Sequence, residues 1–276
     1  MLGLSTHRRM GLLAVLLAMA IATTLHGQRR GFGLSARMAT DDDYDGRFQF
    51  CRVWFQSGFN GDPGAGGWSA DWPRADINLS IRLSELTKTT VGRLPSGQTH
   101  NVVIRLTSPE LFNCPFIMMT EVGASELNSR EVTHLREYLL KGGFLWVDDF
   151  WGSEAWDWWE RQLRKVLPAA EYPIVDLHPD HPLYRSQFVV KATPQIANIG
   201  FWARSGGGTS ERDEDSAIVD TRAILDRHDN IMLLMTHNTD LGDSFEREAD
   251  DPEYFSRMSV PGYAFGINAL LYAMTH

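Results

Sequence analysis

Several features that would reveal an activity directly are scarce in this chain. Its 276 residues include only two cysteines, too few for a fold held together by disulfide bonds. Positive charge is also scarce, because 26 lysines and arginines face 35 aspartates and glutamates and leave a formal net charge of −9. A broad nucleic-acid-binding surface needs clustered positive charge, so we expect no nucleic-acid partner.

Sequence motifs of the common enzyme classes are absent as well. The chain contains no Gly-x-Ser-x-Gly or Gly-x-Cys-x-Gly elbow, which argues against nucleophilic catalysis of the hydrolase or amidotransferase kind. It has no Walker A pattern, no His-Glu-x-x-His metal motif and no dinucleotide-binding glycine pattern after its first predicted strand. Any functional site must therefore be assembled from residues that are far apart in the sequence.

The beginning of the chain has the organisation of an export signal. His7, Arg8 and Arg9 are followed by an uncharged apolar run of 15 residues, and Ala20-Ile21-Ala22 offers the small residues that a signal peptidase reads. This run is short for a bilayer core of about 30 Å. We predict a signal peptide over residues 1–22 and export to the periplasm or the cell exterior. The alternative is an uncleaved anchor, which would be the protein's only membrane contact.

The rest of the chain has an ordinary globular composition, with 43% hydrophobic residues. Residues 23–46 are rich in glycine, arginine and aspartate, and we predict a flexible linker there, followed by a single domain over residues 47–276. After export, Cys51 and Cys114 could form a disulfide bond. They could equally be two small buried hydrophobic side chains.

Predicted strands alternate with predicted helices along this domain. We expect strands at residues 48–55, 102–106, 115–120, 144–147, 172–177 and 231–236, and helices at 73–86, after the cap residues Asn128 and Ser153, and after Pro261. Residues 178–220 are predicted to be irregular and residues 243–253 to form a charged loop. This alternation predicts an α/β fold with an open, doubly wound, mostly parallel sheet.

Candidate binding residues follow from this topology, because ligands of open α/β sheets bind beyond the carboxyl ends of the strands. The segments after the strands carry Asp71, Arg74, Asp76, Glu121, Asp148, Asp149, Trp151, His237, Asn238 and Asp240. Asp243 and Glu246 belong to the same segments. Trp68 and Trp72 flank this edge, where exposed indoles would suit stacking on a sugar, although core packing is the alternative.

The adjacent acids Asp148 and Asp149 are the sharpest of these candidates. They end an apolar strand, and neighbouring strand side chains face opposite sides. One could enter the cleft as a metal ligand or general base while the other caps the next helix. His237 could act with them, oriented by Asp240, or be a hydrogen-bonded structural residue.

Several blocks of sequence resemble a known family, the domain of unknown function 4159. They are residues 71–76 (Asp-Trp-Pro-Arg-Ala-Asp), 109–112 with 115–116, 142–145 with 148–149, 181–184, and 237–248 with 266–268. The resemblance runs from about Phe48 to His276. It implies a flavodoxin-like fold similar to class I glutamine-amidotransferase-like domains, and it implies no established activity.

Two functions follow as alternatives. We favour a non-catalytic ligand-binding or assembly module with an acidic and aromatic cleft, whose partner is a small molecule, a glycan or an envelope protein. The alternative is a hydrolase that uses Asp148 or Asp149 with His237. No cofactor is predicted, although a divalent metal is possible and the hydrolase could depend on one.

Overall fold

A seven-stranded sheet organises the computed structural model, which describes residues 36–58 and 67–276. The strands are β1 (Phe50–Trp54), β2 (Asn101–Arg105), β3 (Phe116–Thr120), β4 (Phe144–Asp148), β5 (Val175–Asp176), β6 (Asp220–Leu225) and β7 (Ile231–His237). Their order is β2-β1-β3-β4-β7-β6-β5. The first five strands of this order are parallel, whereas β6 is antiparallel to both β7 and β5. The prediction of a mostly parallel α/β sheet is confirmed.

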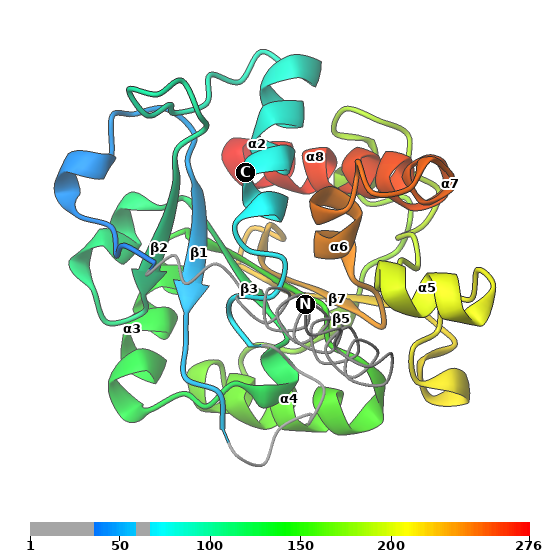
Figure 1. Ribbon diagram of the computed structural model, residues 1–276. Coiled ribbons are helices and arrows are strands. Elements are labelled where there is room, and N and C mark those ends of the chain that lie inside the picture. Colours follow the sequence, from blue (N-terminus) through cyan, green and yellow to red (C-terminus); the bar gives the residue numbers. More distant parts are fainter. Residues whose placement is uncertain (1–35, 59–66) are drawn as a thin grey trace, which may run out of the picture. The chain divides into compact units, whose positions relative to one another are not determined.

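Helices cover both faces of this sheet. They are α2 (Arg74–Leu86), α3 (Ser129–Leu140), α4 (Gly152–Val166), α5 (Ile199–Ser205), α6 (Leu241–Glu246), α7 (Pro252–Tyr254) and α8 (Val260–Thr275). A π-helical turn, Phe255–Ser259, joins α7 to α8. Helices α2 and α8 pack against one face and α3 and α4 against the other, as Figure 1 shows.

Alternate strand residues enter two separate hydrophobic cores. Phe116 and Met118 of β3 pack with α2 and α8, whereas Ile117 and Met119 pack with α3 and α4. A strand that is buried on both faces needs apolar residues at every position. This explains why the β3 sequence is a continuous apolar run rather than an alternating pattern.

Helix-capping signals account for one helix start and fail for another. Asn128 caps α3 by accepting the backbone N–H groups of Arg130 and Glu131, and the Glu131 carboxylate accepts the N–H of Asn128. This capping box is confirmed. The predicted cap of α4 by Ser153 is wrong, because α4 begins at Gly152 and Asp215 accepts the N–H and hydroxyl of Ser153.

Four elements arise in segments that were expected to be irregular. Helix α5 lies within residues 178–220, β6 begins at the end of that segment, and α6 and α7 overlap the predicted charged loop. Strand β6 pairs with β7 although Asp220 and Arg222 interrupt its apolar pattern. Helix α6 has only six residues, and its cap is the Asp240 carboxylate, which accepts the N–H of Asp243.

The predicted signal segment, residues 1–22, lies outside the described residues, as does most of the predicted linker. The described end of the linker is packed: Met38 forms a β-bridge with Val103, and the buried Asp43 accepts the backbone N–H of Thr40. Residues 38–276 form one compact unit.

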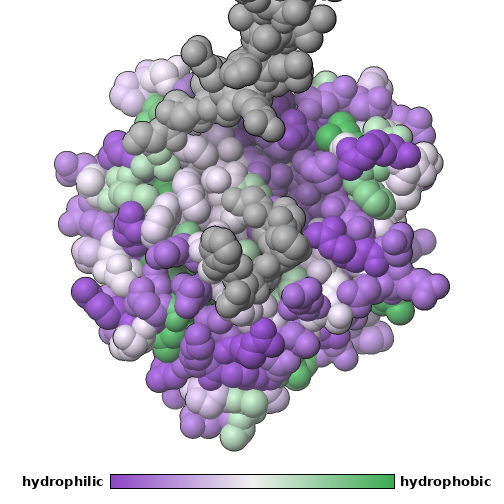
Figure 2. All heavy atoms as spheres, turned by 60° about the horizontal axis from the view of Figure 1, so that its bottom comes forward, coloured by the Kyte–Doolittle hydropathy of each residue, from purple (hydrophilic) through white to green (hydrophobic). Residues whose placement is uncertain are grey.

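Two observations describe the apolar character of the helices and of one face of the surface. Within residues 36–58 and 67–276, no helix combines the length and the apolar character that crossing a bilayer would require. The face drawn in Figure 2 is mostly hydrophilic, and its hydrophobic side chains form small, separate patches.

A disulfide bond links β1 to the segment that leads into β3. Cys51 lies within β1 and Cys114 two residues before β3, and their Cα atoms are 6.2 Å apart. Of the two interpretations of these cysteines, the structure supports the disulfide. The bond fixes the neighbouring strands whose carboxyl ends flank the site described below.

A buried ion pair fixes α2 to the sheet. The Arg52 guanidinium of β1 donates to both carboxylate oxygens of Asp76 in the first turn of α2, and to the Thr120 hydroxyl at 3.1 Å. Both charged side chains are 0% exposed. Because neither charge can reach water, each depends on the other.

Breaking this pair from one side should destabilise the protein strongly. We expect Arg52→Met and Asp76→Leu each to lower the free energy of unfolding by about 3–5 kcal/mol, because each leaves one buried charge uncompensated. The double variant should lose less than the sum of the two. Urea unfolding followed by tryptophan fluorescence measures this, and additive losses would contradict the coupling.

Candidate functional site

A cavity of about 410 Å³ opens at the carboxyl edge of the sheet. Its lining comes from the segments after β1 (Ser69, Ala70, Asp71, Trp72), β3 (Glu121), β4 (Asp149) and β7 (Asp240, Glu246, Arg247), with Asn198 and Glu211 from the segment around α5. Between β1 and β3 the strand order reverses, the position at which open α/β sheets bind ligands. The cavity is therefore placed where this fold class recognises small molecules.

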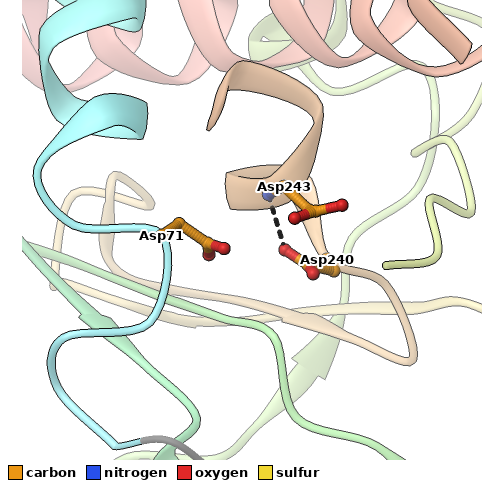
Figure 3. A group of neighbouring side chains, drawn as sticks. All are labelled: Asp71, Asp240 and Asp243. Atoms are coloured by element: carbon orange, nitrogen blue, oxygen red, sulfur yellow. Dashed lines mark hydrogen bonds between the residues drawn. The ribbon is translucent and has the colours of Figure 1, made fainter. Parts of the chain in front are cut away.

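Three aspartates converge beside this cavity, and two of them, Asp71 and Asp240, line it. One carboxylate oxygen from each of Asp71, Asp240 and Asp243 lies within 4.8 Å of the other two. Figure 3 shows Asp71 reaching from the loop before α2 toward Asp240 and Asp243, which lie at the start of α6. We call these three residues the aspartate cluster.

The members of the cluster differ in their partners. Asp71 Oδ2 is buried and has no hydrogen-bond partner among the described residues. Asp243 is well paired, because it contacts Arg247 at 3.3 Å and accepts the Tyr254 hydroxyl at 3.0 Å. Within the described chain, neither Asp71 nor Asp240 forms an ion pair. The cluster thus carries more negative charge than Arg247 offsets.

Burial and mutual repulsion raise the pKa values of these acids. Loss of solvation is the main cause at Asp71, followed by the charge of Asp243, and Arg52 partly opposes the shift. At Asp240, loss of solvation is followed by the charges of Asp149 and Asp71. Desolvation disfavours the charged form of a carboxyl, and a neighbouring like charge adds to that cost. A cation entering the cavity would reverse both effects.

The backbone around the cavity is strained in the segments that follow the strands. Asp71, Glu121, Asp149 and Asn238 have φ values of 60°, 50°, 55° and 63°, and they are four of the six non-glycine residues with positive φ in the described part of the chain. Such conformations cost on the order of 1–3 kcal/mol each and gather at functional sites. Three of these four residues line the cavity.

The two adjacent acids after β4 have separate roles. Asp149 lines the cavity, and its pKa is raised by burial and then by the charge of Glu121. Asp148 does not line it; its carboxylate accepts the Thr236 hydroxyl at 2.5 Å and the Gly242 N–H at 3.1 Å. Burial raises the pKa of Asp148 to about 7, although these hydrogen bonds oppose the shift. Asp148 therefore holds the first turn of α6, which carries Asp243.

His237 is engaged within the protein rather than at the cavity. Its Nε2 donates to the Gly152 carbonyl at 3.0 Å, and its Nδ1 lies 3.4 Å from Asp220. The ring packs against Phe150, with 4.8 Å between ring centroids, and burial lowers the pKa of the imidazole. Asn238 is similarly engaged, since its side chain accepts the N–H of Gly152.

The remaining candidates support the site or lie apart from it. Trp151 is buried and donates its indole N–H to Asp149 at 2.8 Å. Asp76 belongs to the buried pair with Arg52, and Arg74 forms an exposed ion pair with Asp250. Of the ten predicted candidates, the structure brings four to the cavity: Asp71, Glu121, Asp149 and Asp240.

Asn198, Glu211 and Arg247 line the cavity although no motif singles them out. Asn198 caps α5 by accepting the Gly200 N–H, and Glu211 accepts the N–H of Asn198. A capping pattern at Asn198 is the one local signal that points to this segment. Arg247 lies four residues after Asp243, the spacing at which helical side chains meet.

These features define an α/β protein with an anionic cavity at the carboxyl edge of a mostly parallel sheet. Residues 57–274 match the profile of a family described as a domain of unknown function, DUF4159, and the chain belongs to that family. No curated protein matches the chain significantly.

The raised pKa values predict that stability falls as pH rises when no cation is present. Carboxyls whose native pKa exceeds the unfolded value near 4 bind more protons in the native state, so the free energy of unfolding decreases with pH up to their native pKa. Asp148, with a native pKa of about 7, contributes to this loss from about pH 4 to 7, and its contribution is complete above pH 7. In EDTA, urea unfolding of the wild type compared with Asp148→Asn should show an extra loss of about 2 kcal/mol between pH 5 and 7.

Two substitutions check the source of this dependence. The free energy of unfolding of Asp148→Asn should fall less with pH than that of the wild type, whereas Asp157→Asn, at an exposed position of α4, should match the wild type. His181 and His237, whose pKa values are lowered, make the opposite contribution near pH 6.5, but all three proteins share it and it cancels in the comparison. The same pH dependence in Asp148→Asn and the wild type between pH 5 and 7 would contradict the prediction.

Proposed function

We propose that this protein is an exported, non-catalytic binding module that holds a divalent cation of the calcium and magnesium class at the aspartate cluster. The observation that carries the proposal is the convergence of Asp71, Asp240 and Asp243, with one oxygen of each within 4.8 Å of the others. Calcium takes carboxylate oxygens at about 2.3–2.6 Å, so oxygens on opposite sides of one ion are about 5 Å apart. The spacing of the cluster fits this requirement.

The charge balance of the cavity supports a cation as its occupant. Besides Asp71 and Asp240, four acids line it: Glu121, Asp149, Glu211 and Glu246. Arg247 is the only basic residue in the described lining, and it is already paired with Asp243 and Glu246. A bound divalent ion is the largest local charge at such a site and stabilises the ionised form of the acids around it.

Export is supported by two independent features. The N-terminal sequence has the pattern of a cleavable signal, and Cys51 and Cys114 form a disulfide bond, which persists in oxidising compartments. Periplasmic or extracellular calcium modules bind with dissociation constants of about 10⁻⁴–10⁻³ M. We therefore assign the protein to the periplasm or cell exterior. If the signal segment is not cleaved, it would anchor the protein to the membrane.

The finer fold class belongs to the same proposal. The parallel strands have the order β2-β1-β3-β4-β7, which corresponds to the order 2-1-3-4-5 of flavodoxin-like sheets. We assign the domain to this class, and within it we propose a likeness to the class I glutamine-amidotransferase-like domains. Glutamine hydrolysis is not part of the assignment, because both cysteines are in the disulfide bond.

A metal-dependent hydrolase is the second candidate, favoured by one observation. Asp149 lines the cavity beside the cluster with a raised pKa, the property of a general base acting on a cation-bound water. His237 does not line the cavity, so this version of the hydrolase relies on Asp149 alone. Cation-dependent hydrolysis of an aryl ester or glycoside that is lost in Asp149→Asn would favour it.

Calorimetric titration of the EDTA-treated protein with calcium, magnesium and manganese tests the binding module. We expect one site with a dissociation constant between about 10⁻⁵ and 10⁻³ M for at least one ion, and a melting temperature that rises with its concentration. Asp71→Asn and Asp240→Asn should weaken binding at least about tenfold, since each removes a charged ligand.

The matched control is Asp157→Asn, which also removes one negative charge but lies at an exposed position of α4. It should bind the ion like the wild type. In EDTA, the two cluster variants should melt no lower than the wild type, because each relieves repulsion within the cavity. No heat and no thermal shift with any of the three ions at 10 millimolar, an excess of roughly tenfold over the weakest expected constant, would exclude the proposal.

A further inference from the structure

Trp72 gives the anionic cavity an aromatic wall. It lines the cavity one residue after Asp71 of the aspartate cluster, and its side chain is partly exposed. Its indole N–H has no hydrogen-bond partner among the described residues and is not sealed from solvent. A half-exposed indole beside polar groups is a recognition surface, because it presents an apolar face and a polar edge.

The ring of Trp68 packs against the ring of Trp72. The two ring centroids are 5.5 Å apart at an interplanar angle of 51°, and Trp68 packs against the core formed with α3 and α4. The backbone N–H of Trp72 also donates to the Ser69 carbonyl at 3.2 Å. Trp72 is therefore held in place before a ligand arrives, which reduces the entropy lost on binding.

The charges of the cavity restrict the ligand that this wall can serve. Six acids repel phosphate and carboxylate ligands. An organic ammonium group would instead compete with the divalent cation of the proposed function for the same carboxylates. A ligand that binds together with the cation must be close to neutral and rich in hydroxyl groups.

The polar lining matches the groups of such a ligand. Asn198 Oδ1 caps α5, whereas no hydrogen bond within the described chain uses its side-chain N–H₂ group. Asp149 uses Oδ1 to accept the Trp151 indole, and its other oxygen is left to accept a hydroxyl. The volume of about 410 Å³ lies within the range of small-molecule sites.

From these contacts we infer that the cavity binds a saccharide, with neighbouring hydroxyls as ligands of the cation and one apolar ring face packed on Trp72. This inference rests on the proposed cation site and names the class of ligand for it. Hydroxyl oxygens complete the oxygen shell that calcium requires, since three carboxylates leave several positions of its six to eight unfilled. Trp72 then selects for a ligand with a flat apolar face.

Titration of the full mature protein with neutral disaccharides tests the inference. The probes are cellobiose, chitobiose, maltose and lactose, each added with saturating calcium and again in EDTA, and followed by tryptophan fluorescence and calorimetry. We expect at least one disaccharide to bind, with affinity at least tenfold weaker in EDTA. In Trp72→Ala the affinity for sugar should fall at least tenfold while the affinity for calcium stays within twofold, and Trp72→Phe should recover part of the loss.

The matched control is Trp54→Ala, which removes another partly exposed tryptophan that lies outside the cavity lining. It should leave sugar binding unchanged. Calcium binding without binding of any of the four disaccharides, or sugar binding that is the same in EDTA or in Trp72→Ala, overturns the inference and leaves the cation site standing. Failure of calcium, magnesium and manganese to bind removes the proposed function itself.

Discussion

The close approach of Asp71 to Gly242 is the constraint on which the acidic edge of this protein depends. A Cβ atom at Gly242 would overlap Asp71 Oδ2, so any other residue there would displace the Asp71 side chain from its position in the cluster. The same Gly242 donates its N–H to the buried Asp148. Asp240 and Asp243 lie on either side of this glycine, and the contact therefore places all three acids of the cluster together. The cost is repulsion between buried carboxylates that Arg247 only partly offsets.

Two buried polar contacts hold the segments that bring these acids together. The Arg52–Asp76 pair ties the first turn of α2 to β1, and Asp71 lies in the loop that leads into this turn. The positive charge of Arg52 also acts to lower the pKa of Asp71, in opposition to burial. On the other side, Asp148 connects β4 to the first turn of α6. Both contacts place polar groups where an ordinary core would be apolar, as expected where a framework positions a site.

The parts of the fold that the sequence predicts are those with local signals. Strands β3, β4 and β7 are continuous apolar runs, and α3 has its own capping box. The prediction of these four elements therefore needs no knowledge of distant residues. Strand β6 and helix α6 have no such signal. Arg222 breaks the pattern of β6, which exists because β7 offers it a partner, and α6 is a six-residue helix held by Asp240 and Asp148. Tertiary contacts decide both elements.

The candidate site shows the same division. The rule that ligands bind beyond the carboxyl ends of strands leads to Asp71, Glu121, Asp149 and Asp240, because it needs only the strand positions. It does not say which way each side chain turns. Asp148 and His237 end neighbouring strands at the same edge, yet their polar atoms bond to α6 and to Gly152. The packing of α4 and α6 turns the side chains of Asp148 and His237 away from the cavity, and no local sequence pattern predicts this packing.

The chemical groups that line the cavity are those that the proposed recognition requires. The two cysteines are bonded to each other, and both ring nitrogens of His237 have partners within the protein. The lining offers carboxylates, the Ser69 hydroxyl, the Asn198 amide, the Trp72 indole and one guanidinium, that of Arg247. Carboxylates attract a cation, and an indole discriminates by shape and apolar contact. Because Asp71 and Trp72 are adjacent in one rigid loop, an ion on the first residue and a ring on the second would be held side by side, and the affinity for each would depend on the other.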